Sequence, residues 1–150
     1  MLMKTHLAIG IFAAFLLLDK VTYGVAFFIV TLVASLLPDI DSGFSTLGKQ
    51  GIFKPIQFLT RHRGFIHSFT ICVIISVILS LYLPILALPF FLGYGLHIFA
   101  DSFTVDGIRP FWPLRYESKG ILRVGSLVEE MLFTIFCILD GGLFLRFVIS

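Results

Sequence analysis

The residues of this chain that could do chemistry are four histidines at the ends of long apolar runs. Two of them lie close to each other in the sequence, and a third lies close to an aspartate. The histidines are His6, His62, His67 and His97, and the companion carboxylates are Asp39, Asp41, Asp101 and Asp106. Imidazole and carboxylate groups together form the ligand set of zinc and other first-row metals. Because ionisable residues are costly at bilayer depth, an apolar chain that keeps them at its boundaries is predicted to use them.

The segment HIFAD spaces His97 and Asp101 four residues apart. On a helix this spacing projects both side chains from one face, one turn apart, so that they can bind one metal ion or two adjacent ions. The alternative is a simple hydrogen bond between the two side chains. Because the pair closes an apolar run, we interpret it as a pair of metal ligands.

The segment LPDIDS places Asp39 and Asp41 just after Pro38. Two carboxylates this close repel each other unless a positive charge neutralises them, and a cation does so well. We expect one of them to be a metal ligand and the other to bridge, to support a ligand or to act as a base. The alternative is an ordinary polar turn after a helix-ending proline.

The segment HRGFIHS has the highest density of candidate groups, with His62 and His67 on either side of Gly64. Five residues is the wrong spacing for one helix face, but it suits a loop ligand followed by a ligand in the first helical turn. Arg63 offers a planar guanidinium group for a phosphate or carboxylate. The alternative is a pair of interfacial histidines beside anionic lipid.

Three further polar residues are candidates by position. His6 is predicted to join the site because the first helical hairpin returns to the end where Asp39 lies. Asp106 precedes Gly107 and is a candidate ligand, catalytic base or turn former. Glu129 could join the site from the last helix, whereas Glu130 is expected to be a solvated acid of the first turn.

The composition indicates a membrane protein. The chain of 150 residues is 58% hydrophobic and only 13% charged, with a mean hydropathy of +1.04. Soluble domains average roughly 45–50% apolar and about 25% charged residues. The net charge of +2 is too small to predict a nucleic-acid partner. Cys72 and Cys137 lack CxxC spacing and are expected to be buried free thiols.

We predict an all-α fold, a polytopic membrane helical bundle with about five membrane-embedded helices in a single domain, residues 1–150. A spanning helix needs about 20 apolar residues, and no strand-like alternation is present. No small-residue cleavage pattern follows the first apolar run, so it is expected to be retained. The predicted helices are Leu7–Leu18, Val21–Leu37, Gly64–Leu83, Pro84–Ala100 and Leu127–Ile149.

Five passes through a bilayer return every candidate ligand to one membrane face. Nine of the eleven basic residues lie on that face, and only Lys20 and Arg146 lie on the other. The excess of positive charge predicts that the site faces the cytoplasm. The nine are Lys4, Lys49, Lys54, Arg61, Arg63, Arg109, Arg115, Lys119 and Arg123.

The order of these motifs resembles the YdjM-like membrane-bound metal-dependent hydrolases. The resemblance rests on His6, then PDID, HRGFIHS and HIFADSFTVDGIRPFWP, and it runs to about Pro113. More remotely the pattern is similar to zinc-dependent phospholipase C and its nuclease relatives, helical enzymes with an H-x-x-x-D pair among their zinc ligands. The resemblance implies that His97 and Asp101 take the place of that pair.

Further ligands implied by the resemblance are His6, Asp39 and one of His62 or His67. That remote group has additional histidines after the H-x-x-x-D helix, whereas here no histidine follows His97. One or two divalent ions, zinc being the expected metal, are therefore predicted in place of a three-metal cluster.

The function predicted from these observations is hydrolysis by a metal-activated water at the surface of a bacterial or archaeal cell membrane. The substrate class implied is a phosphoester, with a phospholipid headgroup as one example. Whichever of Asp39, Asp41 and Asp106 is not a ligand is the expected base. Arg63 or Arg109 is expected to hold an anionic group. Two alternatives remain open, an ion or metal transporter and a non-catalytic membrane protein with a structural metal.

Overall fold

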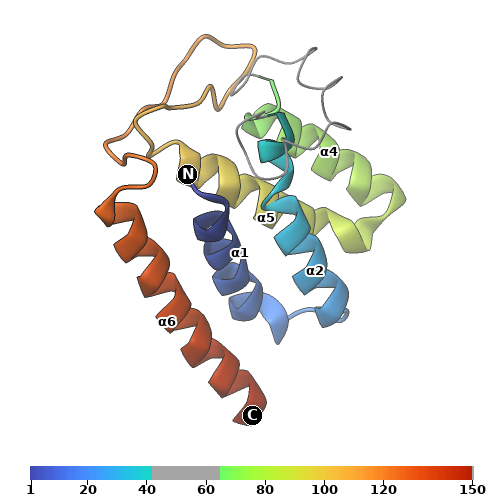
Figure 1. The fold of residues 1–150 in the computed structure, drawn as a ribbon. Coiled ribbons are helices and arrows are strands. Elements are labelled where there is room, and N and C mark those ends of the chain that lie inside the picture. The colour runs from blue at the N-terminus through green and yellow to red at the C-terminus, as the bar shows by residue number, and fades with distance from the viewer. Residues whose placement is uncertain (42–64, 150) are drawn as a thin grey trace.

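The computed structural model describes residues 1–41 and 65–149. Within these ranges every regular element is helical, and no β-strand is present, so the predicted all-α class is confirmed (Figure 1). The elements are α1 (Met3–Leu18), α2 (Gly24–Ala34), the 3₁₀ helix η1 (Leu37–Asp41), α4 (Phe69–Tyr82), α5 (Pro84–Asp101) and α6 (Leu127–Ile149).

The helix ends follow from local chemistry and differ from the predicted ends by a few residues. Helix α2 ends at Ala34, since Pro38 has no N–H group to donate to the Ala34 carbonyl. The chain then forms η1, which holds Asp39 at the end of α2. Helix α4 begins only at Phe69, because the Ser68 side chain caps it by accepting a hydrogen bond from the Ile71 amide at 3.4 Å.

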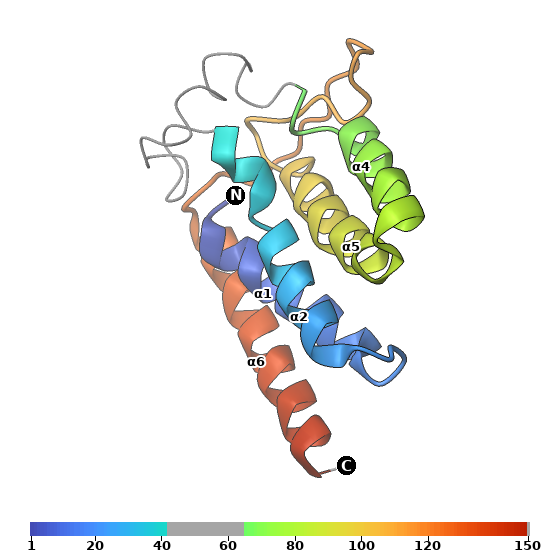
Figure 2. The same cartoon turned by 90° about the vertical axis from the view of Figure 1, so that its right-hand side faces the viewer.

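The helices pack so that most chemistry-bearing ends meet. Helix α5 packs against α1, α2 and α4, and α1 also packs against α2 and α6. Figures 1 and 2 show the N-terminus, η1, the start of α4, the end of α5 and the start of α6 at one end of the bundle. The turn between α1 and α2 and the end of α6 lie at the opposite end.

Two glycines let α1 and α5 approach the end of α2 closely. A Cβ atom on Gly93 would lie 2.1 Å from the Thr31 carbonyl oxygen, a distance that no real side chain tolerates. A Cβ on Gly10 would lie 3.1 Å from the Ser35 hydroxyl oxygen. Gly10 is one turn from His6 on α1 and Gly93 is one turn from His97 on α5, so both close approaches lie directly beneath the histidines.

The outer surface of the bundle is apolar. Helices α5 and α6 are long and apolar enough to cross a membrane, and α1, α2 and α4 are shorter apolar helices. Helix α6 exposes large apolar side chains along its length, among them Ile138 at 70% and Ile149 at 82% exposure. Contiguous apolar surface of this extent is suited to a lipid environment and unsuited to water.

Candidate metal centre

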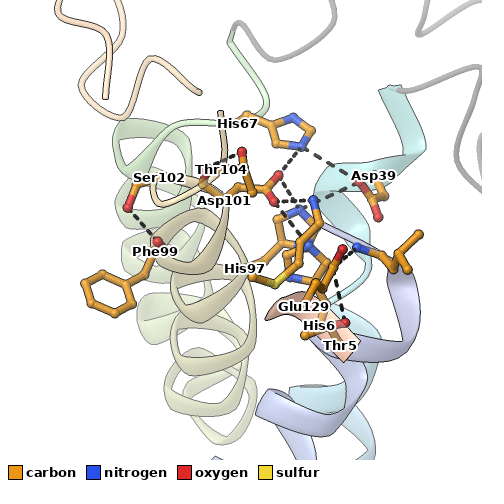
Figure 3. A network of polar contacts seen from close by, with 12 residues as sticks. Thr5, His6, Asp39, His67, His97, Phe99, Asp101, Ser102, Thr104 and Glu129 are labelled. Atoms are coloured by element: carbon orange, nitrogen blue, oxygen red, sulfur yellow. Dashed lines mark hydrogen bonds and ion pairs between the residues drawn. The ribbon is translucent and has the colours of Figure 1, made fainter. Parts of the chain in front are cut away.

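Five of the predicted ligands meet at one end of the bundle, and four different elements supply them. His6 comes from the first turns of α1, Asp39 from η1, His67 from the segment before α4, and His97 and Asp101 from the last turns of α5 (Figure 3). His6, His67, His97 and Asp101 are each 2% exposed or less. Only the Asp39 side chain, 14% exposed, reaches the edge of the cluster.

Asp101 is the central carboxylate of the cluster. Its Oδ2 lies 3.6 Å from His97 Nε2 and 3.7 Å from His67 Nε2. Its Oδ1 lies 3.3 Å from His6 Nε2 and 2.7 Å from the Met1 amino nitrogen. One carboxylate therefore contacts all three imidazoles.

Asp39 approaches the same histidines from the opposite side. Its Oδ1 lies 3.8 Å from His97 Nε2 and 4.0 Å from His67 Nε2. Two groups of potential ligand atoms result, each with all its atoms within 4.8 Å of one another: His6, Asp39 and His97 in one, and His67, His97 and Asp101 in the other.

The distances from His67 and His97 Nε2 to the carboxylate oxygens, 3.6–4.0 Å, are longer than direct hydrogen bonds, and the shortest of them matches the spacing of two ligands of one ion. Bonds of about 2.0–2.2 Å at a tetrahedral centre place neighbouring ligand atoms roughly 3.3–3.6 Å apart. The His97–Asp101 separation of 3.6 Å agrees with this spacing, whereas a good N–H···O bond is about 2.7–3.2 Å long. Within the described residues, His97 Nε2 and both ring nitrogens of His6 are buried with no hydrogen-bond partner. Such atoms are rare in proteins unless they serve a site.

A backbone carbonyl orients the central imidazole. His97 Nδ1 lies 2.7 Å from the Ser35 carbonyl oxygen, and because a carbonyl can only accept, Nδ1 must carry the proton. The Nε2 atom of a neutral ring then holds the lone pair, facing Asp39 and Asp101. A hydrogen bond from the remote ring nitrogen is the usual way in which proteins orient a metal-binding histidine.

His6 and His97 stack face to face. Their ring centroids are 3.7 Å apart and their planes differ by 9°. Two imidazolium rings in this arrangement would repel each other, so the stacking favours neutral rings, the form that binds metal.

A second buried carboxylate, Glu129, anchors the start of α1 to α6. Its Oε1 accepts hydrogen bonds from the Leu2 amide at 2.6 Å and the Thr5 hydroxyl at 3.2 Å. Its Oε2 accepts from the Gly125 amide at 2.6 Å. Glu129 therefore supports the turn that carries His6 instead of contacting the histidines. Glu130 pairs with Lys4 at 2.6 Å, with both side chains partly exposed.

Four further predicted site residues are Asp41, His62, Arg63 and Asp106. Asp41 ends η1, while His62 and Arg63 lie outside the described residues. Asp106 is exposed, in a turn that Gly107 completes with a φ of 67°. Its role as a base stays a prediction.

Arg109 is exposed and pairs with Glu117 at 2.7 Å. The hydrogen bonds from Arg109 and then Lys119 lower the pKa of Glu117 below its ordinary value. Arg109 is thus already matched to a carboxylate at the surface of the loop.

Two contributors to the site carry no pattern in the sequence that points to chemistry. The Ser35 carbonyl is a backbone group, so no residue type marks it. The Met1 amino nitrogen is likewise a main-chain atom that no residue type marks. Only an indirect feature of the sequence points to the close helix packing on which these contacts depend. Gly10 lies one turn from His6, and Gly93 lies one turn from His97.

The fold and the cluster define a class: an all-α membrane protein with buried histidine and aspartate groups positioned to hold a metal ion. The chain matches the YdjM inner membrane protein family over residues 1–147, and it belongs to that family. It is also similar to the uncharacterized protein YvsG of Bacillus subtilis (strain 168), with 29% identity over 105 residues. That match covers 66% of this chain and 66% of YvsG, slightly under two thirds of each. No solved structure matches the chain.

Proposed function

We propose that this chain is a membrane-bound, metal-dependent hydrolase that acts on a phosphoester, with zinc as its metal. The observation that carries the proposal is the meeting of His67, His97 and Asp101, from two separate segments, with ligand atoms within 4.8 Å of one another. Membership of an inner membrane protein family supports the location. Nitrogen and carboxylate oxygen donors suit zinc, whose sites are usually four-coordinate.

The histidine geometry limits how many ions the cluster binds. Both groups of ligand atoms contain His97, and its Nδ1 is already committed to the Ser35 carbonyl. Only Nε2 is left, and one lone pair binds one ion. We propose a single ion through His97, held by Asp101 and His67 on one side and approached by Asp39 on the other. A second ion would need ligands other than His97.

The proposed chemistry divides between the ion and the chain. When bound, a divalent metal lowers the pKa of water toward about 7 and polarises a substrate oxygen. The buried histidines and Asp101 would hold the ion rigidly, and Asp39 lies on the more exposed side of the cluster. Asp41 and Asp106 are the proposed bases, and Arg63 is the proposed group for binding the anionic oxygens. We propose that this side faces the cytoplasm.

Metal content and activity measured together test this function. Purified protein is expected to contain zinc and to hydrolyse a soluble phosphoester such as p-nitrophenyl phosphate. The His97→Ala substitution should remove both properties, whereas Asp19→Asn, at the opposite end of the bundle, should change neither. Asp106→Asn should keep the metal and slow turnover by about 10²–10⁴-fold, the usual effect of losing a general base.

The outcomes separate hydrolysis from a structural metal. If His97→Ala removes zinc and the protein unfolds, while no carboxylate substitution separates metal binding from turnover, the site is structural. If the wild-type protein with zinc or manganese supplied hydrolyses no phosphoester, the proposal of hydrolysis fails.

A further inference from the structure

A large apolar cavity adjoins the metal centre. It has a volume of about 850 Å³ and lies between α1, α5, α6 and the loop that joins α5 to α6. This size lies within the range of about 300–1,000 Å³ that is typical of ligand pockets. Met1 and Ala100 line it at the cluster end, and both adjoin Asp101, one by its amino group and the other in sequence.

The cavity extends from the metal centre toward the middle of the bundle. Its wall on α1 runs from Ile9 to Leu16 and its wall on α6 from Val128 to Phe136. Each wall covers roughly 10–12 Å of helix at 1.5 Å per residue. One leaflet of a bilayer has a hydrocarbon depth of about 15 Å. The cavity therefore has the length of most of one leaflet.

The polar residues of the cavity lie at its loop end. Of the cavity's lining residues in the described part of the chain, only Arg123 and Ser126 have charged or hydroxyl side chains. Both belong to the loop between α5 and α6. Among the described residues Arg123 forms no ion pair, whereas Arg109 and Lys119 in the same loop share Glu117. An apolar channel whose mouth carries a cation with no ion-pair partner in residues 1–41 and 65–149 is complementary to an anionic amphiphile.

We propose that this cavity binds one acyl chain of an anionic phospholipid from the leaflet next to the metal centre, with Arg123 contacting the phosphate. The inference rests on the proposed function and names the substrate class of that site. The acyl chain lies along α1 and α6, and the headgroup lies at the loop end near Asp101. Several lining residues are also exposed, among them Leu16 at 48% and Phe99 at 54%, so that a lipid could enter sideways from the bilayer.

Photo-crosslinking tests the proposal. Wild-type protein in detergent micelles is titrated with phosphatidylglycerol that carries a diazirine in one acyl chain, and the labelled peptides are mapped. We expect labels concentrated on the walls of the cavity in α1 and α6, and several-fold less label when phosphatidylcholine carries the same group. Arg123→Gln should abolish this preference, and Arg123→Lys should keep it.

A matched pair of substitutions distinguishes the cavity from general lipid contact. Leu132→Trp fills the cavity from α6 and should lower labelling several-fold. Leu139→Trp, two turns further along α6 and outside the cavity, should leave labelling unchanged. Zinc content and thermal unfolding of both variants report whether they fold.

Two results would overturn the proposal: labels spread evenly over all exposed apolar helices, or labelling that is equal in the Leu132→Trp and Leu139→Trp proteins. Hydrolysis of a soluble phosphoester by the wild-type protein is measured in parallel. Hydrolysis without cavity labelling refutes the lipid site alone, and cavity labelling without hydrolysis or bound zinc refutes the proposed reaction alone.

Discussion

At the scale of single residues, the arrangement of the cluster depends on which groups each carboxylate oxygen contacts. Asp101 uses both of its oxygens, one toward His67 and His97 and the other toward His6 and the Met1 amino group. A buried carboxylate without such partners would be strongly destabilising. Asp101 is therefore at once the carboxylate nearest to the centre of the cluster and the residue that ties α1 to α5.

Glu129 is buried and the adjacent Glu130 is partly exposed, so substitutions at the two positions test how burial of a carboxylate affects stability. The Glu129→Gln substitution replaces one acceptor oxygen with an NH₂ group, which must then face a backbone or hydroxyl donor inside the bundle. Leaving such a group unmatched costs about 1–3 kcal/mol, so we expect a clearly lower thermal unfolding temperature and lower zinc affinity. Unfolding in detergent, with zinc content, measures both.

Glu130→Gln is the matched control. It breaks only a partly exposed pair with Lys4, with side chains 42% and 45% exposed. Such pairs contribute about 0–1 kcal/mol. Equal effects of the two substitutions would show that Glu129 does not anchor α1 as its hydrogen bonds indicate.

At the scale of elements, close packing of α5 on α2 positions the central histidine. Gly93 brings the α5 backbone against Thr31, and one turn later His97 reaches the Ser35 carbonyl and Asp39. The histidine and its orienting carbonyl therefore depend on a helix separation that only glycine permits.

The Gly93→Ala substitution should push α5 away from α2. Alanine favours a helix over glycine by about 1 kcal/mol, but overpacking of a tight contact typically costs about 1–3 kcal/mol and moves backbone. We expect lower zinc affinity together with lower thermal stability. Zinc titration and thermal unfolding of the same sample provide the measurement.

Gly95→Ala, on the same helix, is the control. Its Cβ would lie 3.8 Å from Phe69 and 3.9 Å from Cys72, both ordinary contacts, so zinc affinity should not fall. A Gly93→Ala protein that binds zinc like the Gly95→Ala protein would show that the helix separation does not control the site.

The sequence was enough to predict the helical class and the two longest helices almost to the residue. Apolar runs and Pro84 mark α5, and the run from Leu127 marks α6. The shorter helices were less predictable. Helix α2 ends three residues before the prediction, because Pro38 converts its last turn into η1, and α4 starts five residues later, at the Ser68 cap.

The sequence is enough to predict that the candidate ligands meet, but not the geometry with which they meet. The hairpin topology alone brings His6, Asp39, His67, His97 and Asp101 to one end. Which atoms face one another depends on side-chain directions and on backbone groups such as the Ser35 carbonyl. His67 also lies just before the α4 cap, outside the first turn in which the spacing had placed it. Sequence spacing does not encode these details.

At the scale of the whole molecule, the structure has a polar end and an apolar body. The cluster, the start of α6 and the loop between α5 and α6 lie at one end, and the turn between α1 and α2 lies at the other (Figure 1). If the bundle sits in the membrane along its helices, the two ends face different compartments. The orientation of the bundle then decides which compartment supplies the proposed substrate.

The distribution of basic residues predicts that orientation. Nine of the eleven lysines and arginines belong to segments on the side of the cluster by the sequence-derived topology, and Lys20 and Arg146 to the other. Positive charge near membrane spans stays in the cytoplasm. The metal centre should therefore face the cytoplasm.

Two tyrosines with nearly equal exposure allow this orientation to be measured. Tyr23, in the turn before α2, is 61% exposed, and Tyr116, in the loop between α5 and α6, is 60% exposed. In a protein with Cys72→Ala and Cys137→Ser, each tyrosine is replaced singly by cysteine, and intact cells are treated with a membrane-impermeant maleimide. We expect Tyr23→Cys to be labelled in intact cells and Tyr116→Cys only after permeabilisation, because the loop next to the centre is cytoplasmic. The reverse pattern would place the cluster on the outer side of the membrane, where a different set of substrates is available. Labelling of both cysteines in intact cells would show that the two ends of the bundle do not lie on opposite sides of the membrane.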